Sequence, residues 1–225
     1  ILERNLHWRY NTSVGAGLPI NFALADLQNS GDKITRIEGV FSGTLSWLCS
    51  KYDGIRPFSE LVLEAQKMGF TEPDPREDLS GRDMQRKLLI LARELGVELE
   101  LDDISLSALI PHELALGSWD DFLNKKTQLD AFIEEHAATA KAKNSVLRYT
   151  GLLEIKQGEV IAKVGIAYVP NGDALANLTP GDNIFVINSK WYSDNALVIQ
   201  GPGAGREVTA AGVHSDLYWL VQNLK

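Results

Sequence analysis

The spacing of apolar residues changes near the middle of the chain, and this change limits the folds that the chain can adopt. In the first half, apolar residues recur with the period of about 3.6 residues that is typical of one helix face. The second half instead alternates apolar and polar residues, as half-buried strands do. Predicted helices cover residues 20–29, 42–51, 59–68, 81–95, 120–143 and 209–224, and predicted strands cover residues 34–41, 146–155, 160–169, 184–191 and 196–200.

Helices together with strands that cluster late in the chain predict the α+β class. The short connection at Gln157-Gly158 predicts an antiparallel strand pair. A long parallel βαβ series, an internal repeat and a low-complexity segment are all missing from the sequence. We therefore expect residues 1–225 to form a single domain around one mixed, mostly antiparallel sheet.

The charge balance excludes several kinds of partner. Lys and Arg number 22 against 30 Asp and Glu, which gives a net charge of −8. An acidic chain without a basic stripe repels phosphate backbones and anionic membranes, so a nucleic-acid binder is disfavoured. A bilayer span needs about 20 apolar residues in a row, and the sequence has no such run.

Two features indicate the setting of the chain. Its single cysteine, Cys49, forms no internal disulfide, which favours a reducing compartment such as the cytoplasm. Because no basic residue neighbours Cys49, we interpret it as a core residue rather than a nucleophile. The chain begins at Ile1 without a signal peptide, and we expect it to be a fragment of a longer protein.

The segment 69–95 is the most informative for chemistry. Pro73 and Pro75 stiffen a loop and push the residues before them toward extended conformations. Four carboxylates crowd this loop, and they repel one another unless cations share the site. They are Glu72, Asp74, Glu77 and Asp78.

The helix that follows this loop carries a pair of opposite charges. Ser80 lies three residues before Asp83, a spacing that predicts a capping box. Asp83 and Lys87 are four residues apart and share one helix face, beside an apolar stripe. We expect Lys87 to be half-buried, either as a group that donates and accepts a proton or as one half of a surface ion pair.

Two glycine-rich turns could approach a ligand. In residues 11–20, Gly15 and Gly17 precede a helix whose first N–H groups are free. Residues 201–209 resemble a dinucleotide-binding loop only superficially, because Pro202 follows the first glycine and no later strand completes a βαβ unit. The histidines are scattered, and no Cys/His metal cluster is present.

Taken together, these segments resemble the catalytic, substrate-binding region of homoserine dehydrogenase. The matching text is NTSVGAGLPI from Asn11, EGVFSGTLSW from Glu38, GFTEPDPREDLSGRDMQRKLLILARE from Gly69 and GPGAGREVTAAGVHSDL from Gly201. The chain is most similar to the C-terminal part of a bacterial bifunctional aspartokinase–homoserine dehydrogenase of the methionine-linked type.

The resemblance implies an oxidoreductase that interconverts homoserine and aspartate-4-semialdehyde with NADP or NAD, in the pathway to threonine and methionine. By motif position, Lys87 is the proton donor and acceptor for the substrate oxygen. Glu72 binds the substrate ammonium, while Asp78 and Asp83 complete the pocket and hold Lys87. A proton at that oxygen must accompany hydride transfer, so the residue types suit the reaction.

The resemblance also assigns the glycines to the cofactor. Gly15 and Gly17 lie by the nicotinamide, and Gly203 and Gly205 approach the cofactor from the C-terminal turn.

Some relatives hold a monovalent cation at the first of these turns. The matching positions here are Asn11, Val14 and Ala16, and Asn11 stands where those relatives have an acid.

The family's nucleotide-binding Rossmann half precedes this region and is absent here, so the resemblance implies that the fragment alone is inactive. It further implies a sheet with helices on one face, whose other face or edge pairs with a second copy in a homodimer. The alternative is a non-enzymatic dimerisation or interaction module, in which the loop carboxylates only cap helices.

Overall fold

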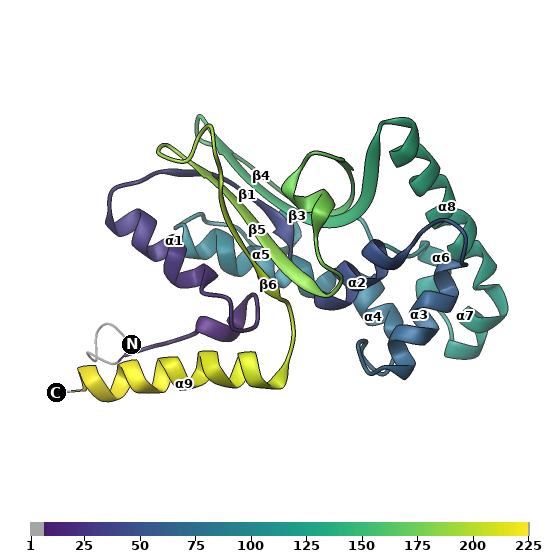
Figure 1. Ribbon diagram of the computed structural model, residues 1–225, viewed down its shortest axis with the longest axis horizontal. Coiled ribbons are helices and arrows are strands. Elements are labelled where there is room, and N and C mark those ends of the chain that lie inside the picture. Colours follow the sequence, from purple (N-terminus) through teal and green to yellow (C-terminus); the bar gives the residue numbers. More distant parts are fainter. Residues whose placement is uncertain (1–6, 225) are drawn as a thin grey trace.

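The computed structural model describes residues 7–224, so Ile1 lies outside the described part. One six-stranded sheet, in the order β2-β4-β3-β1-β5-β6, forms the centre of the molecule (Figure 1). All neighbouring strands are antiparallel except the short β2, which runs parallel to β4. The strands are β1 (Ile34–Val40), β2 (Ser105–Leu106), β3 (Ser145–Lys156), β4 (Glu159–Pro170), β5 (Asp182–Ser189) and β6 (Leu197–Pro202).

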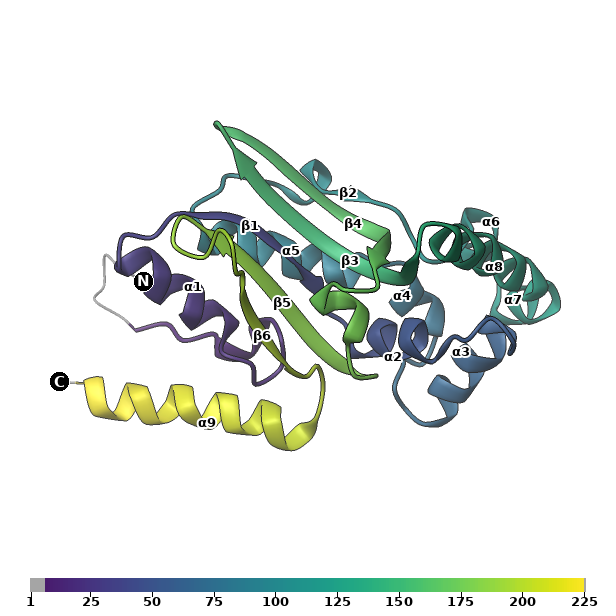
Figure 2. The ribbon, with the colours of Figure 1, turned by 45° about the horizontal axis from the view of Figure 1, so that its top comes forward.

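Helices pack on one face of this sheet, which confirms the predicted mixed α+β architecture. Helices α1 and α5 lie along that face, α2 packs at its end, and the helices α3, α6, α7 and α8 gather beyond it (Figures 1 and 2). The helices are α1 (Ile20–Asn29), α2 (Gly43–Lys51), α3 (Phe58–Lys67), α4 (Pro75–Leu79), α5 (Arg82–Glu94), α6 (His112–Ala115), α7 (Trp119–Lys125), α8 (Thr127–Ala142) and α9 (Arg206–Asn223). Short 3₁₀ turns are η2 (Asn11–Ser13), η3 (Leu101–Asp103) and η4 (Ala174–Asn177).

The centre of the sheet is built to admit one aromatic ring. Gly39 of β1 pairs with Gly151 of β3, and a Cβ at either position would lie 2.6 Å from the ring of Phe41. That ring is fully buried and stacks on Phe185 at a centroid distance of 4.9 Å. The packing fixes the backbone between β1 and α2, which borders the candidate site.

The segment that joins α3 to the sheet-packing helix α5 differs from its prediction. The loop contains the short helix α4, and α5 begins at Arg82, one residue after the predicted start. The predicted capping box is wrong, because Gly81 stands at the N-cap with φ +74° and Ser80 instead donates its hydroxyl to the Glu77 carbonyl. Glycine is required there, since a Cβ would lie 1.9 Å from the hydroxyl of Tyr149.

The predicted helix 120–143 is two helices, α7 and α8, that meet at Lys126. Trp119 stacks on the buried Phe122 within α7. Asp130 of α8 makes a tertiary contact instead, since it accepts hydrogen bonds from the backbone and hydroxyl of Ser59 in α3. A tertiary contact of this kind can override a continuous helical pattern.

Cys49 is buried in the main core, as expected, and burial raises the pKa of its thiol to about 12. Within residues 7–224, none of the helices has both the length and the apolar character that crossing a bilayer would require.

Candidate active site

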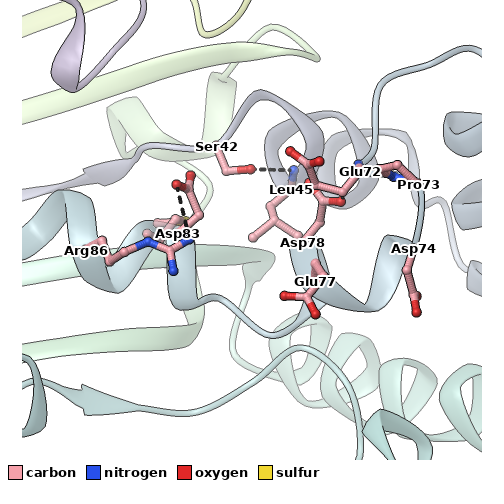
Figure 3. A pocket seen from close by; sticks show the side chains of 10 residues that line it. Ser42, Leu45, Glu72, Pro73, Asp74, Glu77, Asp78, Asp83 and Arg86 are labelled. Carbon is pink, nitrogen blue, oxygen red and sulfur yellow. Dashed lines mark hydrogen bonds and ion pairs between the residues drawn. The ribbon is translucent and has the colours of Figure 1, made fainter. Parts of the chain in front are cut away.

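The proline-bounded loop before α5 brings two of its four carboxylates together. Pro75 occupies the first turn of α4, and Asp74 caps that helix by accepting the Arg76 N–H at 3.0 Å. The other end of α4 carries Asp78, whose Oδ2 accepts the backbone N–H of Glu72 at 2.9 Å. Figure 3 shows Glu72 and Asp78 side by side, with Asp74 pointing away from them.

The Asp78 carboxyl is the more buried member of this pair. Burial raises the pKa of Asp78, although the hydrogen bond from Glu72 acts in the opposite direction. A second carboxylate close by also favours the protonated form. A cation bound between Glu72 and Asp78 would offset both effects.

Lys87 is fixed from two directions. Its Nζ lies 2.7 Å from Asp83 Oδ2, one turn earlier on α5, and donates to the carbonyl oxygen of Phe41 at 2.9 Å. The side chain of Lys87 is 23% exposed and that of Asp83 is 54% exposed. An ammonium has three N–H donors. Contacts with the described residues use two of them, so one remains for a ligand.

The expected ion pair between Asp83 and Lys87 is therefore present. Among the described residues, Lys87 forms its ion pair with Asp83 and not with Asp78. Asp78 organises the Glu72 backbone instead. The second anchor of Lys87, the Phe41 carbonyl, is not predictable, because a backbone oxygen leaves no signature in the sequence.

Two cavities meet at Lys87. One, of about 760 Å³, is lined by the site carboxylates, the start of α2 and the turn before α9. The other, of about 850 Å³, lies between the Gly15 turn and α9. The residues that line both cavities are Lys87, Gly203, Ala204 and Gly205.

The first cavity is the acidic one. Glu72, Asp78 and Asp83 all line it, and Lys87 is the cation that faces them. A neighbouring hollow of about 520 Å³, drawn in Figure 3, shares these three carboxylates but not Lys87. A ligand that needs both a cation and carboxylates is therefore best accommodated in the first cavity.

Three of the four predicted glycines line the second cavity, namely Gly15, Gly203 and Gly205. A Cβ at Gly203 would lie 2.2 Å from Asn183 Oδ1, so glycine is required there for the turn to pack against Asn183. Gly17 does not line this cavity. A Cβ at Gly17 would lie 2.3 Å from the Val208 carbonyl oxygen, so this glycine lets α9 approach.

The predicted cation site offers one clear ligand atom. Asn11 is buried, and its Oδ1 has no hydrogen-bond partner among the described residues. Val14 is fully buried, and Ala16 adopts a positive φ of 55° that turns the backbone sharply. Residues 7–224 contain no cluster of three or more His, Cys, Asp or Glu suited to a metal ion. An orphaned amide oxygen fits a weakly held monovalent cation better than a transition metal.

The sequence and the fold match one family. The family model for homoserine dehydrogenase matches residues 19–218. The bifunctional aspartokinase/homoserine dehydrogenase 2 of Escherichia coli is 49% identical over 218 residues, which cover 97% of this chain and 26% of that protein. The chain thus spans about a quarter of the length of this curated relative.

Solved structures agree in fold. A putative homoserine dehydrogenase from Archaeoglobus fulgidus has a TM-score of 0.76 and 26% identity, covering 97% of this chain and 60% of that one. A hyperthermophilic archaeal homoserine dehydrogenase mutant in complex with NADPH has a TM-score of 0.69 at 21% identity, covering 96% and 56% respectively. With the family model matching most of its length, the chain belongs to the homoserine dehydrogenase family.

Proposed function

We propose that this chain is the substrate-binding catalytic domain of an oxidoreductase that interconverts homoserine and aspartate-4-semialdehyde with NADP or NAD. The observation that supports this most is the position of Lys87. Its ammonium lies where the two cavities meet, held by Asp83 and by the carbonyl oxygen of Phe41. A proton donor between an amino-acid site and a cofactor site is what carbonyl reduction needs.

In the acidic cavity, the carboxylates of Glu72 and Asp78 bind the substrate ammonium. This places the other end of the substrate, the aldehyde or hydroxyl oxygen, toward the third N–H of Lys87. During reduction Lys87 donates that proton to the oxygen, and during oxidation it accepts the hydroxyl proton. Its positive charge also stabilises the alkoxide that develops at the oxygen.

The anchors of Lys87 support this role. Asp83 keeps a negative charge beside the ammonium, and the Phe41 carbonyl sets the direction in which the remaining N–H points. A lysine held in this way loses little conformational entropy when it meets the substrate.

The second cavity is the proposed place of the nicotinamide end of the cofactor, which supplies or receives the hydride when bound. Gly15, Gly203 and Gly205 line this cavity, whereas Gly17 allows the close approach of α9. The rest of the cofactor would need a nucleotide-binding half from another part of a longer protein. The limited coverage of the relatives supports this, and we infer that residues 1–225 alone do not turn over substrate.

We further infer a structural monovalent cation at the Gly15 turn. Asn11 Oδ1 and the backbone carbonyls of Val14 and Ala16 would hold it. Its role would be electrostatic, since it would stiffen the turn that borders the cofactor cavity.

The open face of the sheet is the proposed interface of a homodimer. It carries an ion pair between Arg36 and Glu38, flanked by the exposed side chains of Ile161 and Val198. Burial raises the pKa of Glu38, which is consistent with a face that is already partly dry. The single cysteine, Cys49, supports a cytoplasmic enzyme. The net charge of −8 argues against a nucleic-acid or membrane partner.

A binding experiment separates this proposal from a non-enzymatic interaction module. Titration of the 225-residue chain with homoserine is expected to show weak, saturable binding by calorimetry. Glu72→Gln keeps the size of the side chain but removes its charge, so it should weaken binding by about tenfold or more. Glu113→Gln, on the exposed face of α6, is the matched control and should bind as the wild type does.

Absence of homoserine binding in the folded wild-type chain would favour the interaction module. Equal binding by the wild type and Glu72→Gln would refute the role given to Glu72.

A further inference from the structure

Arg76 joins the carboxylate loop to a different part of the fold. Its guanidinium forms a two-pronged contact with Asp74, with Nε 3.0 Å from Oδ1 and Nη2 2.6 Å from Oδ2. Nη1 donates to the carbonyl oxygens of Gly117 and Ser118, at 3.1 and 3.3 Å. The side chain is only 13% exposed. One residue therefore bridges the start of α4 and the turn before α7.

The α7 side of this bridge is rigid. Ser118 and Asp121 form a capping box that fixes the first turn of α7. The Arg76 guanidinium lies 5.9 Å from the ring centroid of Trp119, and that ring stacks on the fully buried Phe122 at 4.8 Å. Arg76 is therefore attached to a part of the molecule that does not itself line the acidic cavity.

The loop side of the bridge leads directly to the substrate site. Asp74 stands two residues after Glu72, and the carbonyl oxygen of the intervening Pro73 accepts a hydrogen bond from Gln66 of α3 at 3.0 Å. The Glu72 N–H is tied to Asp78 at the other end of α4. With Pro73 and Asp74 both held, little freedom remains for the backbone of Glu72.

The charges of Arg76 and Asp74 also support an ordered carboxylate loop. The hydrogen bonds from Arg76 lower the pKa of Asp74 and keep its carboxylate ionised. The guanidinium also neutralises that charge, so the carboxylate that caps α4 is held by an ion pair as well as by the helix.

We propose that Arg76 is a positioning residue for the amino-acid substrate: it fixes the Glu72 carboxylate at the acidic cavity by clamping Asp74 to the turn before α7. This inference rests on the proposed function, because it assumes that Glu72 binds an ammonium there. Lys87 is anchored separately, by Asp83 and the Phe41 carbonyl. Loss of the clamp therefore weakens substrate binding and leaves the proton donor in place.

The test compares Arg76→Ala, Arg76→Lys and Arg56→Ala in the full-length protein that carries this chain. Arg56 is a suitable control, because it makes ion pairs with Glu60 and Glu64 on the surface of α3, away from the clamp. Arg76→Ala is expected to raise the homoserine KM by about tenfold and to change kcat by less than about threefold. The KM for NADP or NAD should stay unchanged.

Arg76→Lys separates positioning from mere charge. Lysine retains the positive charge but lacks the planar fork, so it should recover only part of the affinity. If Arg76→Ala does not fold, Asp74→Asn replaces it, because this change removes the ion pair and retains an oxygen that can cap α4. Asp74→Asn should then show the same rise in KM.

The outcomes are distinct. An unchanged homoserine KM in folded Arg76→Ala, or in Asp74→Asn, would overturn the clamp while leaving the proposed function intact. A fall in thermal stability without a change in KM would also overturn it, since a purely structural role predicts that result. A wild-type enzyme that does not use homoserine would overturn both proposals.

Discussion

At the scale of single residues, Lys87 makes two contacts that differ in how predictable they are. The sequence predicts the ion pair with Asp83 but not the hydrogen bond to the Phe41 carbonyl. The four-residue spacing from Asp83 places the two charges on one helix face, and the structure has them 2.7 Å apart. The Phe41 carbonyl lies 46 positions earlier in the chain and reaches Lys87 only in the folded protein, where α5 packs on the sheet. No pattern of side chains marks such an oxygen.

The glycines show the same division. Gly15, Gly203 and Gly205 line the second cavity, whereas Gly17 makes a close contact with α9 that local spacing does not predict. Gly203 is packed against Asn183, which is fully buried and whose amide has no hydrogen-bond partner among the described residues.

Gly203→Ala should therefore disturb the turn between the two cavities. The added Cβ would lie 2.2 Å from Asn183 Oδ1, so the turn or the asparagine must shift, at a cost of about 1–3 kcal/mol. We expect a lower melting temperature by calorimetry and a higher KM for NADP or NAD. Gly172→Ala is the control, since a Cβ there meets nothing within 4 Å. Equal melting temperatures and KM values in the two variants would contradict this account of Gly203.

At the scale of elements, the sequence predicts most of the strands and helices because each has a clear apolar period. The predicted strand 146–155 corresponds to β3 over Ser145–Lys156, and the predicted helix 20–29 matches α1 over the same ten residues. Errors occur where tertiary contacts decide. The box at Ser80 fails because Tyr149 requires a glycine at position 81.

The sequence fails to predict helix α4 for a different reason. It is only five residues long, and its proline and its cluster of acids are typical of a loop. Asp74 as the cap and Pro75 in the first turn are nevertheless a favourable start for a helix. The short helix matters, because it brings Asp78 back to Glu72.

The Asp78 carboxylate is expected to lower the stability of the folded protein and to strengthen homoserine binding. Burial raises its pKa, so in the folded protein the ionised form is less favourable than in the unfolded chain. Ionisation of Asp78 therefore lowers the free energy of unfolding. This loss is absent at pH values well below the ordinary aspartate pKa, and it is complete once the pH exceeds the raised pKa of Asp78 in the folded protein. Asp78→Asn removes this loss, since an amide oxygen still accepts the Glu72 N–H.

The expected results for Asp78→Asn at neutral pH are a higher melting temperature and weaker homoserine binding. In the wild type, homoserine affinity should fall as the pH drops through the raised pKa of Asp78, where the carboxyl takes up a proton. Calorimetric titrations across this pH range measure both effects. A variant that is less stable than the wild type and binds homoserine equally well would refute this role.

At the scale of the whole molecule, the fold brings together segments that are distant in the sequence. The Gly15 turn, the start of α2, the carboxylate loop, α5 and the turn before α9 converge around the two cavities, at the end of the sheet where β1 and β6 finish and β5 begins. The α+β class and the family resemblance are predictable from motifs, and the family is confirmed. The sequence does not predict the division into two cavities with Lys87 between them, because this arrangement depends on how α9 returns beside the N-terminal segment.

The central claim is that Lys87 transfers the proton to and from the substrate oxygen. The most direct measurement is the steady-state kinetics of Lys87→Ala in the full-length protein that carries this chain, with Lys67→Ala, an exposed lysine of α3, as the control. We predict that Lys87→Ala lowers kcat by about 10³-fold with a homoserine KM within about threefold of the wild type, and that the control is unaffected. A kcat for Lys87→Ala within about tenfold of the wild type would contradict the account.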